Sequence, residues 1–213
     1  MQFELVNVKD RTLDELIKAY ETIMSTVIYT KYTDANVAGM CETKLLTWLR
    51  STDFYKAPAS TRFHESVVGG LLVHTLNVYN NVISLLNAPQ FAQCDATSAA
   101  FIALVHDWCK INYYEPYERN VKNEETGQWE KQTAFRTNQT GVPLGHGVSS
   151  MFLAAKFFRL TPEEALAIRW HMGPWRVVDS EMNELQLASE NYPLVHLIQF
   201  ADSLSITNYA NLY

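Results

Sequence analysis

Cysteine is scarce in this chain of 213 residues: there are three, and none belongs to a CxxC pair. An odd number of cysteines without that spacing excludes a disulfide framework and a zinc site built from thiolates. The sequence also lacks a secretory signal and any run of about 18 apolar residues, so no membrane span is expected. We therefore expect a cytoplasmic protein without a membrane partner.

The chain also lacks an excess of positive charge. It has 17 Lys and Arg residues and 23 Asp and Glu residues, which give a formal net charge of −6. Proteins that grip long nucleic acids usually present a basic face. A small phosphate ester remains compatible with this charge, since a bound cation can supply the local positive charge. Hydrophobic residues make up 47% of the chain, enough for one substantial core, and we expect a single domain over 1–213.

Apolar residues recur at helical spacing through most of the chain. They predict helices over about 12–28, 35–49, 66–86, 95–110, 147–158, 161–170 and 193–204. The segment 112–143 interrupts this pattern with aromatic and polar residues around a Glu-Thr-Gly sequence, which indicates a β-hairpin or a long ordered loop. The sequence therefore predicts an all-α domain in which 1–60 form a helical N-terminal extension and 112–143 form an insertion.

The central predicted helix, AAFIALVHDWCK, is apolar almost all round but contains His106 and Asp107 side by side. A buried imidazole and a buried carboxylate are costly unless they are paired or bound to an ion. Lys110 lies one turn further on the same face, where an ammonium would suit a phosphate oxygen. Cys109 in the same segment is interpreted as a small buried hydrophobe.

Further polar groups lie where apolar residues are expected. His74 in GGLLVHTLNV and Asp202 in LIQFADSLS each interrupt an apolar helix, His146 lies between glycines, and His171 follows the helix predicted over 161–170. One such residue alone is more often a hydrogen-bonded core residue. Together, imidazole and carboxylate ligands without thiolate suit Mn, Fe, Co, Ni, Zn or Mg rather than a closed structural zinc site.

The order His…His-Asp…Asp resembles the HD-domain metal-dependent phosphohydrolase superfamily. The segments GGLLVHT, LVHDWCK, LGHG, WHMG and FADSLS are similar, in order and spacing, to segments of the HD domains of bacterial 3′–5′ exoribonucleases. The resemblance covers about residues 60–205 and implies an HD-domain helical bundle that binds one or two divalent ions. It implies that the first ion is held by two histidines and two aspartates: His74, His106, Asp107 and Asp202.

The resemblance also implies roles for the remaining site residues. His146 and His171 match positions that hold a second ion, and Asp107 would bridge the two ions and orient the attacking hydroxide. Lys110 matches a lysine that contacts phosphate, and His64 matches a further histidine near the site. The group that protonates the leaving oxygen is left open between His171 and His64.

These features predict a divalent-metal-dependent phosphohydrolase or phosphodiesterase that acts on a nucleotide, a cyclic or short oligonucleotide, or a similar small phosphoester. Tyr113 and Trp175 are candidate substrate contacts, with packing as the alternative. A 3′–5′ exonuclease on single strands is less expected, because those exoribonucleases carry a β-fold for oligonucleotides where this chain has the helical segment 1–60. A non-catalytic nucleotide-binding HD module is the other alternative. His196 is assigned to structure, since it lies about 120° around its helix from Asp202.

Overall fold

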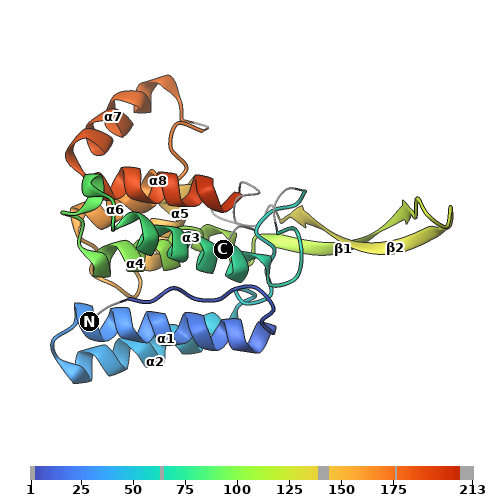
Figure 1. Ribbon diagram of the computed structural model, residues 1–213, viewed down its shortest axis with the longest axis horizontal. Coiled ribbons are helices and arrows are strands. Elements are labelled where there is room, and N and C mark those ends of the chain that lie inside the picture. The colour runs from blue at the N-terminus through green and yellow to red at the C-terminus, as the bar shows by residue number, and fades with distance from the viewer. Residues whose placement is uncertain (1–2, 63–64, 139–143, 176, 207–213) are drawn as a thin grey trace.

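The computed structural model describes residues 3–62, 65–138, 144–175 and 177–206. This part of the chain forms eight α-helices and one antiparallel pair of strands (Figure 1). The helices are α1 (Leu13–Lys31), α2 (Ala35–Ser51), α3 (Gly70–Leu85), α4 (Ala96–Val105), α5 (His146–Ala154), α6 (Pro162–Arg169), α7 (Met182–Asn191) and α8 (Pro193–Ile206). The prediction of a mainly helical protein is therefore confirmed. None of the described helices is long and apolar enough to cross a membrane.

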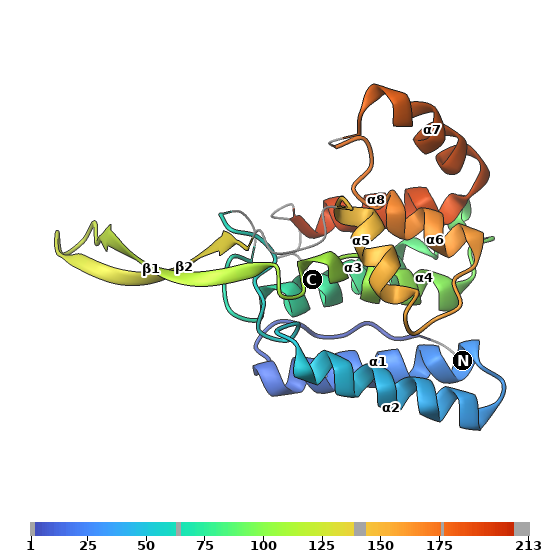
Figure 2. The same ribbon diagram turned by 180° about the vertical axis from the view of Figure 1, so that it is seen from behind.

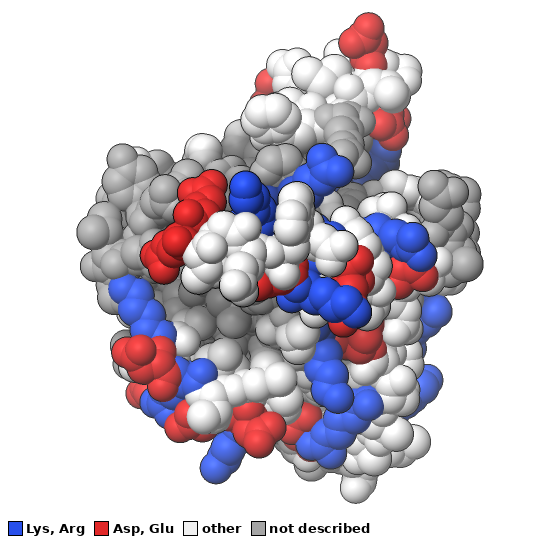
Figure 3. Space-filling model, turned by 90° about the vertical axis from the view of Figure 1, so that its right-hand side faces the viewer, with Lys and Arg blue, Asp and Glu red and all other residues white. Residues whose placement is uncertain are grey.

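The interruption predicted at 112–143 is a β-hairpin, made of β1 (Tyr114–Lys122) and β2 (Trp129–Thr137). The ribbon projects well beyond the helices (Figure 2). Most of its side chains are exposed, and Ala134 and Phe135 are buried near its base. Figure 3 views the molecule from the side on which the hairpin projects, and lysine and arginine side chains lie there among aspartates and glutamates.

The two N-terminal helices α1 and α2 form a layer below α3 and α4 (Figure 1). Helix α1 begins at a capping box made by Thr12 and Glu15. Its Tyr20 is fully buried, donates a hydrogen bond to the Leu104 carbonyl at 3.1 Å and accepts one from the Trp108 indole at 3.3 Å. The Tyr20 hydroxyl thus links α1 to Leu104 and Trp108, which precede and follow the His106-Asp107 pair in the sequence.

Tyr20→Phe is expected to lower the free energy of unfolding by about 1–3 kcal/mol, because it leaves a buried carbonyl and a buried indole N–H without their partner. Chemical denaturation of the variant measures this loss. Tyr29→Phe is the matched control, since Tyr29 lies on the same helix and is 48% exposed. Equal stability of both variants would contradict the expected role of the Tyr20 hydroxyl.

The prediction of one continuous helix over 95–110 is wrong for its last turn. Helix α4 ends at Val105, His106 is its C-cap, and Asp107 leaves helical geometry at φ −107° and ψ 20°. The following residues, Trp108–Lys110, form a separate 3₁₀ turn, η2, in which the Lys110 N–H bonds back three residues to the Asp107 carbonyl. The directions of the side chains after His106 therefore differ from those on a continuous helix.

Two other helix boundaries differ from prediction, and one helix was not predicted. Helix α3 begins at Gly70 rather than near residue 66, and a Cβ at Gly70 would lie 1.9 Å from the Glu65 carbonyl oxygen, so only glycine fits there. Helix α5 ends at Ala154 and not near 158. Helix α7 was not predicted, because only Leu185 and Ala188 are buried along it, too few for a clear apolar pattern.

Candidate metal centre

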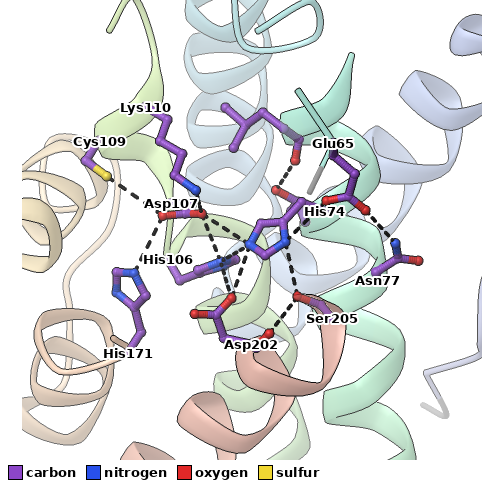
Figure 4. Close-up of polar contacts among 12 residues, drawn as sticks. Glu65, His74, Asn77, His106, Asp107, Cys109, Lys110, His171, Asp202 and Ser205 are labelled. Atoms are coloured by element: carbon purple, nitrogen blue, oxygen red, sulfur yellow. Dashed lines mark hydrogen bonds and ion pairs between the residues drawn. The ribbon is translucent and has the colours of Figure 1, made fainter. Parts of the chain in front are cut away.

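Six predicted ligands meet at one place in the fold. They come from three helices and two helix ends that are far apart in the sequence. Helix α3 carries one histidine, the end of α4 an adjacent histidine and aspartate, the end of α6 one histidine and α8 one aspartate (Figure 4). The sixth ligand is a histidine at the start of α5. In chain order they are His74, His106, Asp107, His146, His171 and Asp202.

The first group of ligand atoms surrounds the Nε2 atom of His74. This nitrogen lies 3.3 Å from His106 Nε2, 3.2 Å from Asp202 Oδ1 and 3.2 Å from Asp107 Oδ2. His106 Nε2 lies 3.5 Å from the same Asp107 oxygen. Ligand atoms about 2.1 Å from a common ion lie about 3.0–3.4 Å apart when they are neighbours, so separations of 3.2–3.5 Å are close to those around one divalent ion. His106 Nε2 and Asp202 Oδ1 are further apart, at 4.0 Å. His74, His106 and Asp202 can hold the ion together.

The hydrogen bonds of the outer nitrogens fix how two of the imidazoles are presented. His106 Nδ1 donates to the Ala103 carbonyl and His171 Nδ1 donates to the Ile168 carbonyl, each at 2.8 Å. The Nε2 lone pair of each ring then points into the cluster. Metal-binding histidines are usually oriented in this way by a bond from the other ring nitrogen.

His74 is oriented from the opposite side of the cluster. Its Nδ1 lies 3.1 Å from the Ser205 hydroxyl, which donates its own hydrogen to the Asp202 carbonyl at 2.7 Å and therefore accepts from the imidazole. The Glu65 carboxylate lies 3.6 Å from the same nitrogen and is held by the Asn77 amide at 3.1 Å. These partners leave His74 Nε2 facing the aspartates.

The cluster requires positive charge at its centre. Burial lowers the pKa of His74, but hydrogen bonds to Asp107 and Asp202 outweigh burial and raise it to about 9. Burial raises the pKa of Asp202, but its hydrogen bond with His74 and the charges of His74 and His106 together outweigh burial and lower it to about 2. Burial lowers the pKa of His106. A proton on His74 meets the requirement for positive charge, and a divalent ion among these atoms would replace that proton.

A second group of ligand atoms faces the other oxygen of Asp107. Its Oδ1 lies 3.5 Å from His171 Nε2, 3.8 Å from His146 Nε2 and 3.9 Å from Cys109 Sγ. His171 is 1% exposed, and its Nε2 has no hydrogen-bond partner among the described residues. The 3.5 Å contact with Asp107 is longer than an ordinary hydrogen bond, and an ion at this position would engage the buried nitrogen. The two oxygens of Asp107 thus serve two adjacent positions.

Lys110 completes the cluster with a positive charge beside Asp107. Its Nζ lies 2.6 Å from Asp107 Oδ2, and Lys110 is 8% exposed. Burial lowers the pKa of Lys110, but the Asp107 carboxylate raises it overall, so the ammonium stays charged. The exposed fraction of the side chain rises from 0% at His106 to 15% at Asp202 and 31% at His146. Solvent therefore reaches the cluster from the side of Asp202 and His146.

The predicted substrate contacts are placed unevenly. The Tyr113 ring lies edge-on to the His146 ring, with centroids 6.4 Å apart. Trp175 is 74% exposed, and the part of the chain that the structure describes shows no contact between it and the cluster. His64 lies outside the described residues. His196 is exposed and stacks on Phe200 rather than facing the cluster, in agreement with a structural assignment.

Three residues of the site were missed in the sequence. Ser205 and Glu65 approach His74 through the packing of α8 and of the segment before α3, and no local pattern marks either one. Cys109 was taken for a packing residue, but its thiol faces the Asp107 carboxylate. The adjacent His106-Asp107 pair was the signal that could have directed attention to Cys109.

Comparisons of the chain with protein-family models, curated proteins and solved structures found no match.

Proposed function

We propose that the protein is a divalent-metal-dependent phosphohydrolase of the HD-domain type that acts on a small phosphoester such as a nucleotide or a cyclic or short oligonucleotide. One observation carries the proposal: the two carboxylate oxygens of Asp107 face two separate groups of imidazole nitrogens, with the Lys110 ammonium beside them. Paired cation positions that share a carboxylate are typical of enzymes that cleave phosphate esters.

Each residue has a distinct task in this proposal. When bound, divalent ions supply an activated water and neutralise charge on phosphoryl oxygens. One ion would be held by His74, His106, Asp107 and Asp202, and the other by Asp107, His146 and His171. The Lys110 ammonium would donate to a phosphoryl oxygen and stabilise the charge that develops there.

His171 is better suited to hold an ion than to protonate the leaving oxygen. Its side chain is fully buried, its Nδ1 is engaged with the Ile168 carbonyl, and its Nε2 faces Asp107. A group that transfers a proton to the substrate must reach the leaving oxygen within hydrogen-bond distance. We therefore assign His171 to metal binding alone.

The charge distribution favours a small substrate over a long strand. The side of the molecule around the hairpin mixes acidic and basic side chains (Figure 3), and the whole chain carries a net charge of −6. A protein that tracks a polymer backbone needs a continuous basic groove. The Lys110 ammonium and bound cations are enough for one or two phosphates.

The purified protein is expected to contain a divalent transition metal and to hydrolyse bis-p-nitrophenyl phosphate in the presence of Mn²⁺. A chelator should remove both the metal and the activity, and added metal should restore them, because the proposed reaction depends on cations held by these side chains. Metal analysis and the absorbance of p-nitrophenolate measure the two quantities. A protein that neither binds metal nor hydrolyses the ester after reconstitution would contradict the proposal.

A further inference from the structure

Cys109 directs its thiol to the carboxylate oxygen of Asp107 that His171 also faces (Figure 4). Its Sγ lies 3.9 Å from Asp107 Oδ1, the atom that is 3.5 Å from His171 Nε2 and 3.8 Å from His146 Nε2. The sulfur, the carboxylate and the His146 nitrogen lie within 4.8 Å of one another, close enough to hold a common ion.

The break after α4 is what brings the thiol to this place. On a continuous α-helix, residues two apart point about 200° apart, so Cys109 would face away from Asp107. Here Asp107 leaves helical geometry and Cys109 lies in the η2 turn. The Cys109 backbone N–H donates to the Ser150 hydroxyl on α5 at 3.0 Å, which anchors the thiol to the helix that begins at His146.

The distances suit a tetrahedral centre with one sulfur ligand. With bonds of about 2.3 Å to sulfur and about 2.1 Å to oxygen and nitrogen, tetrahedral ligands lie about 3.6 Å apart for sulfur and oxygen and about 3.4 Å for nitrogen and oxygen. The separations of the sulfur and the two histidine nitrogens from Asp107 Oδ1 exceed these values by a few tenths of an ångström or less. His171 Nε2, buried without a hydrogen-bond partner among the described residues, provides an independent indication that a ligand belongs there.

We propose that Cys109 binds the second ion as a thiolate, together with Asp107, His146 and His171, and that it makes this position selective for a thiophilic ion such as Zn²⁺, Co²⁺ or Fe²⁺ over Mg²⁺. The inference rests on the metal centre of the proposed function. On binding, the sulfur–metal bond forms and the thiol proton passes to solvent. Soft thiolate ligands select such ions, whereas carboxylate and water ligands suit Mg²⁺.

The two positions therefore differ in chemistry. His74, His106 and Asp202 offer nitrogen and oxygen to the first ion, and the described residues place no thiol beside them. The second position combines nitrogen, oxygen and sulfur. The first position, with nitrogen and oxygen ligands, would accept a range of divalent ions, whereas the second position would prefer a thiophilic ion. The centre would then hold different metals at its two positions.

Titration of the full-length, metal-free protein with Co²⁺ tests the inference by absorption. A sulfur-to-cobalt charge-transfer band in the near ultraviolet is expected as the second position fills. Cys109→Ser should lose this band and bind Zn²⁺ at least about 10-fold more weakly. Mutation of residues that only hydrogen-bond to a metal ligand already lowers metal affinity by about that factor. Cys94→Ser, which changes a partly buried cysteine elsewhere, should keep the band.

A second measurement uses the unmodified chain and so does not depend on the folding of a variant. Zn²⁺ should protect Cys109 from alkylation and leave Cys94 reactive, as read by mass spectrometry of the peptides. Cobalt bound without the band, or a band that persists in Cys109→Ser, would overturn the role of Cys109 but leave the proposed function standing. No metal bound by any form of the protein would overturn both.

Discussion

Asp107→Ala is expected to abolish metal binding and to reduce phosphoester hydrolysis by more than about 100-fold, since replacement of groups that merely support ligands already costs up to that factor. Asp107 is the side chain whose two oxygens face both groups of ligand nitrogens, at 3.2 Å from His74 Nε2 and 3.5 Å from His171 Nε2. Metal analysis and steady-state kinetics measure both losses.

Two controls separate chemistry from folding in this test. Asp107→Ala leaves the Lys110 ammonium buried without its partner, which costs about 3–5 kcal/mol. Asp107→Asn keeps the shape and one carbonyl oxygen but removes the charge, so it should fold and still lose metal. His196→Gln changes an exposed histidine and should leave the rate unchanged. Bound metal and turnover retained in Asp107→Asn would contradict the assignment.

Lys110→Gln is expected to change metal affinity and turnover in opposite directions. The Lys110 Nζ lies 2.6 Å from Asp107 Oδ2, the oxygen that also faces the first group of ligand atoms. A cation at this distance competes electrostatically with a metal ion, so its removal should tighten metal binding. Turnover should fall about 10²–10³-fold, because a preorganised donor to the transition state is lost.

Isothermal titration with Mn²⁺ and kinetics at saturating metal measure the two effects of Lys110→Gln separately. Lys156→Gln removes an exposed ammonium elsewhere and should alter neither quantity. Weaker metal binding in Lys110→Gln would show that the ammonium serves only to hold Asp107 in place. An unchanged turnover rate would show that Lys110 does not take part in the reaction.

Side-chain chemistry made much of the candidate site predictable. His74, His106 and Asp202 stand out because imidazoles and carboxylates are expensive in apolar helices, and the structure brings all three together. The hairpin was predictable for a similar local reason, since polar and aromatic residues around a Glu-Thr-Gly turn break the helical pattern. Both signals lie within short windows of sequence.

Features that depend on tertiary contacts were not predictable in this way. The apolar run up to Val105 continues into Trp108 without a glycine or proline, so periodicity extends the helix past its true end. The break is accompanied by the hydrogen bond from Tyr20 to the Leu104 carbonyl, a contact between residues 84 positions apart. Cys109 was assigned to packing because a free cysteine usually behaves as a small buried hydrophobe, and the break that turns its thiol towards Asp107 was not predicted.

The convergence of α3 and α8 on one cluster has a consequence for the stability of the whole chain. His74 and Ser205 are 131 positions apart, and the ligands between them come from three further segments. An ion held as proposed would join these segments and close long loops that are otherwise held by packing and by hydrogen bonds and ion pairs within the cluster. At a free concentration 100 times its dissociation constant, such an ion adds about 2.7 kcal/mol to the free energy of unfolding. The concentration of free metal would then set the stability of the folded protein as well as its rate of turnover.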